Sequence, residues 1–66
     1  MKTWTLVWFL IMPPTEGSNI TWEYGQNTNM TFEECSSQLV TDDTAYRLMA
    51  QKKEIIGHEI YCREET

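Results

Sequence analysis

The chain has 66 residues, of which 41% are apolar and 12% aromatic, and it carries a formal net charge of −5. This length gives room for one domain, residues 1–66, and the apolar content is not that of a disordered segment. The five lysine and arginine residues form no stripe along the sequence, which argues against nucleic acid or anionic lipid as a partner.

Residues 3–12 form an apolar run rich in β-branched and aromatic side chains. In a strand, Trp4 and Trp8 point to one pleat face and Val7 and Phe9 to the other, so both faces are apolar. This pattern is typical of a central strand, or of a strand whose outer face meets a partner. The proline pair that follows ends the strand, because proline cannot donate to a ladder.

The same N-terminal run has an alternative interpretation as part of a signal peptide within residues 1–17, since Lys2 precedes it and residues 15–17 resemble a cleavage site. We favour the strand, because its composition is not leucine-rich and its removal would leave too little chain to bury a core. An apolar run of this length is too short to cross a bilayer as a helix.

A second strand is predicted over residues 20–24, where Ile20, Trp22 and Tyr24 alternate with polar residues. The segment that follows, residues 25–29, is predicted to be a loop from its glycine and asparagine content.

The strongest local signal is a capping box at the start of a predicted helix over residues 31–53. Thr31 accepts from the amide of Glu34, and the Glu34 side chain reaches back to the amide of Thr31. The apolar stripe of this helix also contains Asp43, an acidic residue where a core residue is expected. We therefore expect the helix to kink or restart within residues 41–43.

The last predicted strand spans residues 55–63, with His58, Ile60 and Cys62 on one face and Tyr61 on the other. The predicted fold is α+β, with the order ββαβ and a three-stranded sheet of spatial order 2-1-3. One helix covers one face of this sheet, and a right-handed crossover through this helix carries the chain to the third strand, which is parallel to the second. The opposite face is expected to stay open and to expose large apolar groups, which usually mark an interaction site.

In this arrangement Cys35, in the first turn of the helix, and Cys62, on the last strand, point toward each other. We therefore expect a Cys35–Cys62 disulfide, although two buried thiols are the alternative. A zinc site of Cys35, His58 and Cys62 is disfavoured because zinc motifs bring closely spaced ligand pairs. A Cys–His nucleophile is disfavoured because a fold this small offers no cleft. We expect no cofactor, no metal and no enzymatic activity.

Four segments, TWTLVWFL, NITWEYG, MTFEECSSQL and GHEIYCREE, resemble short uncharacterised bacteriophage proteins, including marine ones. These proteins combine an N-terminal apolar strand with one cysteine at a helix start and another on a C-terminal strand. The resemblance implies a phage accessory protein acting in or on a bacterial cell, but it implies no catalytic or binding residue.

The leading hypothesis is a non-enzymatic interaction module that binds a protein partner, or itself, through the open sheet face. We assign the partner contact to Trp4, Trp8 and Tyr61. The alternative is an exported structural domain stabilised by the Cys35–Cys62 disulfide. The host cytoplasm, the periplasm and the exterior are all left open as its location.

Overall fold

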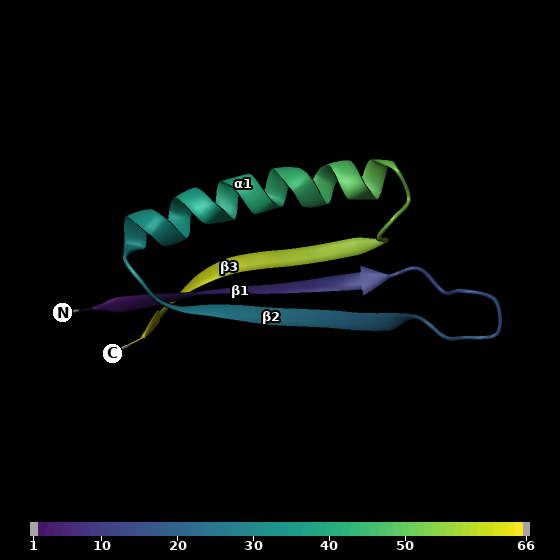
Figure 1. Cartoon of the computed structure of the whole chain (residues 1–66), viewed down its shortest axis with the longest axis horizontal. Coiled ribbons are helices and arrows are strands. Elements are labelled where there is room, and N and C mark those ends of the chain that lie inside the picture. The colour runs from purple at the N-terminus through teal and green to yellow at the C-terminus, as the bar shows by residue number, and fades with distance from the viewer. Residues whose placement is uncertain (1, 66) are drawn as a thin grey trace.

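The computed structural model describes residues 2–65 as three strands and one helix. In chain order these are β1 (Thr3–Met12), β2 (Thr21–Met30), α1 (Phe32–Gln51) and β3 (Gly57–Glu65). The strands form one sheet of order β2-β1-β3 in which β1 is antiparallel to both neighbours, and α1 runs alongside the sheet (Figure 1). The predicted α+β class, the ββαβ order and the 2-1-3 sheet are confirmed.

β1 is the central strand because its composition allows it to be buried on both faces. Thr5, Leu6 and Val7 are consecutive, so they alternate between the two faces, and all three are buried. Its observed bounds match the predicted ones, since Pro13 and Pro14 follow Met12 and cannot extend the ladder.

β2 is twice as long as predicted and continues through the segment expected to be a loop. β1 pairs with β3 at nine positions and with β2 at eight, and this pairing outweighs the weak strand propensity of residues 25–29. Gly25 fits because it lies directly beneath the Trp8 indole ring, where a Cβ atom would overlap. The register shifts between Trp4 and Leu6, and Asn29 on the facing strand has φ of 58°, as expected for a bulge.

α1 begins at the predicted capping box. The Thr31 hydroxyl accepts from the Glu34 amide at 3.1 Å, and the Thr31 amide donates to the Glu34 carboxylate at 2.9 Å. The helix then runs without interruption to Gln51, so the predicted kink within residues 41–43 was wrong. Lys52 caps this end, and the next residue, Lys53, has a left-handed φ of 62° that turns the chain away from the helical path.

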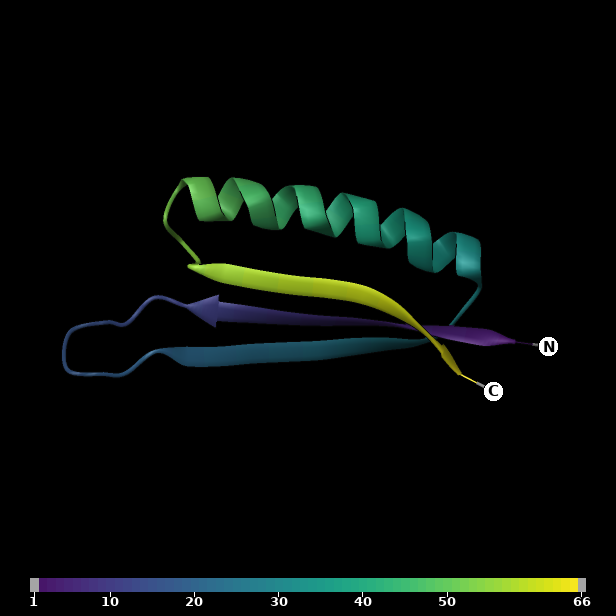
Figure 2. The same cartoon turned by 180° about the vertical axis from the view of Figure 1, so that it is seen from behind.

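The helix lies over β3 and β1 and scarcely reaches β2. After α1 the chain enters β3 through Ile55, which is almost fully buried, and Ile56, whose amide donates to the Ile11 carbonyl at 2.9 Å. Strand β3 begins at Gly57, two residues later than predicted, and extends to Glu65. Figure 2 shows that both ends of the chain lie at one end of the sheet, opposite the hairpin of residues 13–20.

Candidate functional site

The cross-strand register shows which side chains of β1 face the helix. Leu6 lies opposite Cys62 and Leu10 lies opposite His58. Cys62 forms a disulfide with α1 and His58 forms a hydrogen bond with it, so both side chains face the helix. The even-numbered side chains of β1 therefore lie on the helix side of the sheet. The odd-numbered side chains, including Phe9, therefore point to the open face.

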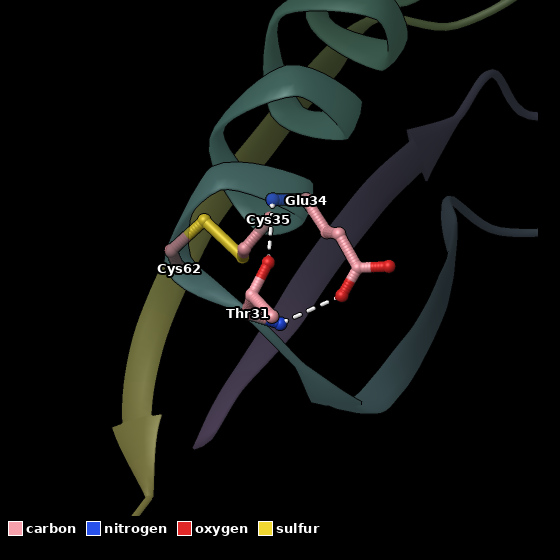
Figure 3. Close-up of a disulfide and its surroundings, with 4 residues drawn as sticks. All are labelled: Thr31, Glu34, Cys35 and Cys62. Carbon is pink, nitrogen blue, oxygen red and sulfur yellow. Dashed lines mark hydrogen bonds between the residues drawn. A yellow bond between two sulfur atoms is a disulfide. The ribbon is translucent and has the colours of Figure 1, made fainter. Parts of the chain in front are cut away.

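The predicted disulfide is present. Cys35 is fully buried in the first turn of α1, and it is bonded to Cys62 on β3, with 6.1 Å between the two Cα atoms (Figure 3). The bond ties the start of the helix to the far part of the last strand, across 27 positions of sequence. Neither cysteine is a free thiol in this oxidised chain.

A second link between helix and sheet explains the acidic residue in the apolar stripe. The Asp43 carboxylate lies 2.7 Å from Nε2 of His58 and 2.9 Å from Nε of Arg47. Hydrogen bonding to His58, followed by the charge of Arg47, holds the pKa of Asp43 below its ordinary value. The centroid of the Tyr46 ring lies 5.7 Å from that of the His58 imidazole, and the His58 side chain is 19% exposed. Asp43 can therefore occupy a core-facing position without breaking the helix.

This Asp–His pair has no metal-binding companion in the described part of the chain, where no group of three or more ligand side chains converges. The Asp43 carboxylate holds the His58 imidazole in one orientation. The geometry of the pair suits a structural clamp at the end of β3 opposite the disulfide.

One half of the open face is an aromatic surface, which we call the open-face patch. Phe9 and Tyr24 lie on neighbouring strands, with ring centroids 6.1 Å apart and planes inclined by 29°. Trp22 is 64% exposed and Tyr24 is 70% exposed, values that leave most of each ring in contact with water. The patch consists of Phe9, Ile11, Trp22, Tyr24 and Tyr61.

The other half of the open face is covered by an arginine that crosses the sheet. Arg63 on β3 donates to the Glu65 carboxylate at 2.8 Å and, at 3.5 Å, to the side-chain oxygen of Gln26 on β2. It therefore passes above β1, where Thr5 and Val7 are buried although no helix lies on this side. The hydrogen bond from Arg63 lowers the pKa of Glu65 below its ordinary value.

The structure separates the three residues to which partner contact was assigned. Tyr61 lies on the open face as part of the patch. Trp4 and Trp8 lie on the helix side, where Trp4 packs against Phe32 with centroids 4.9 Å apart and Trp8 covers Gly25. Those two rings are half-buried packing groups and do not belong to the open face.

The face that each β1 side chain occupies depends on the register between β1 and β3, which the structure provides and the sequence alone did not. Leu6 and Cys62 pair directly across β1 and β3. Once Cys62 is taken to face the helix, every even-numbered residue of β1 must face it too. Phe9, Ile11, Trp22 and Tyr24 are then left on the open side.

Comparison with known proteins finds no match for this chain among protein-family models, curated proteins or solved structures. Within residues 2–65, no helix combines the length and apolar character needed to cross a membrane.

Proposed function

We propose that this chain is a small non-enzymatic interaction module that binds a protein partner through the open face of its sheet. The observation that carries the proposal is the open-face patch, in which Trp22 and Tyr24 are mostly exposed beside Phe9 and Ile11. Aromatic side chains of this kind dominate the energy of protein interfaces. A contiguous apolar surface on so small a domain usually marks a binding site.

The charged residues around the open-face patch indicate the chemical character of the partner surface. Glu59 lies opposite Phe9 at the patch border, and it forms no ion pair with any residue in the described range. Arg63, the cation of this face, is already engaged by Glu65. The complementary surface is therefore apolar at its centre and basic at its rim, and a nucleic acid backbone fits poorly.

Paired variants on the two sides of the molecule test this proposal. Trp22→Ser/Tyr61→Ser removes exposed rings from the patch, whereas Val40→Ser/Leu48→Ser removes exposed apolar side chains from α1. The tagged proteins are used to capture partners from a bacterial host, and the affinity for each captured protein is then measured with purified components. We expect the patch variant to lose binding and the helix variant to keep it; the reverse pattern would refute the proposal.

Self-association through the same face is the second arm of this test. If two copies bind face to face, sedimentation of the wild-type protein will show a concentration-dependent dimer that the patch variant lacks. The resemblance to short phage proteins supports an accessory role in a bacterial host and agrees with either arm.

A second candidate function is an exported structural domain, and the observation that favours it is the Cys35–Cys62 bond. Disulfides persist mainly in oxidising compartments such as the periplasm. Intact mass measurement on protein from its natural host tests this idea. A mass lower by two hydrogen atoms than that of the reduced chain supports export, and two free thiols argue for the cytoplasm.

A further inference from the structure

The two edges of the sheet differ in accessibility. The β3 edge lies under α1, and Figure 3 shows β3 passing behind the first turns of the helix. Strand β2 pairs only with β1 in the described range, and nearly all of its residues are exposed. Its outer row of backbone amides and carbonyls is therefore open to another strand.

The β2 edge also lacks the features that normally prevent strand addition. Residues 21–30 contain no proline, lysine or arginine, and their one charged residue is Glu23. By contrast, the β3 edge carries Glu59, Arg63 and Glu64. The bulge at Asn29 limits the regular part of β2 to residues 21–27, a segment whose midpoint is Tyr24.

From these features we infer that two copies of the chain pair through their β2 edges. The strands run antiparallel about a two-fold axis at Tyr24. This register places Tyr24 opposite Tyr24 of the second copy, Glu23 opposite Gly25 and Trp22 opposite Gln26. No like charges face each other, so the strand is complementary to itself. The result is one continuous six-stranded sheet of order 3-1-2-2-1-3.

Side chains in the central row of this sheet favour a second copy over an unrelated strand. In each copy Glu59, Phe9 and Tyr24 already lie side by side across three strands. Pairing at Tyr24 joins the two rows, so four aromatic rings lie in line with an acidic residue at each end. Aromatic cross-strand pairs of this kind stabilise antiparallel ladders.

The helices do not obstruct this arrangement. Each α1 lies over β3 and β1, so the two helices lie toward the outer strands of the dimer and away from its axis. The two open faces lie on the same side and form one wider surface. The inference concerns the sheet edge, so it stands or falls independently of what binds the face.

Cysteine cross-linking tests the register directly. In Tyr24→Cys the two new cysteines lie opposite each other, with Cα atoms about 5 Å apart, within disulfide range. In Trp22→Cys they are displaced by four residues, about 13 Å along the strand, and cannot bond. We expect the Tyr24→Cys dimer to form about tenfold faster under mild oxidation. Peptide mapping should locate the bond at position 24. Equal rates for the two variants would overturn the register.

Sedimentation measures the association itself. We expect the wild-type protein to dimerise reversibly and Tyr24→Lys, which brings two like charges together at the axis, to stay monomeric. The matched variant Tyr61→Lys changes the open face but not the edge, and it should still dimerise. Since each copy carries a net charge of −5, dimerisation should strengthen with added salt. A wild-type protein that stays monomeric at every concentration and salt level would overturn the inference.

Discussion

Breaking the Cys35–Cys62 bond should cost about half of the stability of this chain. The bond closes a loop of 27 positions, and in the chain-entropy model such a loop restricts the unfolded chain by about 12 cal/mol/K, or about 3.5 kcal/mol near room temperature. A domain of 66 residues is expected to have a net stability of roughly 3–10 kcal/mol. The reduced protein should therefore be marginally folded.

Urea titration followed by tryptophan fluorescence measures this cost, with the oxidised and reduced wild-type proteins compared in the same buffer. The comparison keeps both sulphur atoms in place, so it isolates the bond from the cavity that Cys35→Ala would create at a fully buried site. A loss below about 1 kcal/mol would show that the unfolded chain is already restricted without the bond, and it would refute the entropy argument.

Three further predictions concern single residues. Gly25→Ala places a methyl group inside the Trp8 ring and should cost about 1–3 kcal/mol in a urea titration, and much less when Trp8→Leu is also present. Thr31→Ala removes the helix cap and should cost about 1 kcal/mol by the same assay, whereas Thr31→Ser should be close to neutral. Because the pKa of Asp43 lies below its ordinary value of 3.8 in the folded chain, its contribution to stability is complete above that pH and is lost as the pH falls further. Thermal melting across this acid range should show a smaller decline for Asp43→Asn than for the wild type, and an equal decline would contradict the assigned role of the His58 bond.

Local signals in the sequence predicted the parts of the fold that depend on neighbouring residues. The β1 bounds followed from an apolar run ended by two prolines, and the helix start followed from the Thr31–Glu34 box. The disulfide followed from combining these elements into one topology. For the strand bounds and the helix start, the deciding residues lie within one element or at its ends, whereas the disulfide also required the order of the elements.

The errors arose where a distant strand decides the outcome. Residues 25–29 have poor strand propensity, but β1 provides a ready ladder for them. Asp43 suggested a break in the helix because its partner, His58, lies 15 positions away and is recognised only once β3 is placed under α1. Trp4 and Trp8 were assigned to the binding surface without knowledge of the register between β1 and β3, and this register places both rings on the helix side.

The central position of β1 also bears on the signal-peptide alternative. Residues 3–12 supply Leu6 and Val7 to the core and pair with both other strands. Cleavage after residue 17 would remove the strand that holds β2 and β3 together. Any exported form with this fold must therefore retain residues 3–12.

The placement of both chain ends at one end of the sheet gives the molecule a base and a tip. Residues 2 and 65 lie at the base, while Ile11 and Trp22 lie beside the hairpin at the tip (Figure 1). A ten-residue strand separates the two by roughly 33 Å. A chain that is immobilised through either terminus, or fused there to a carrier protein, would thus be held by its base. The aromatic rings near the tip would then point away from the attachment.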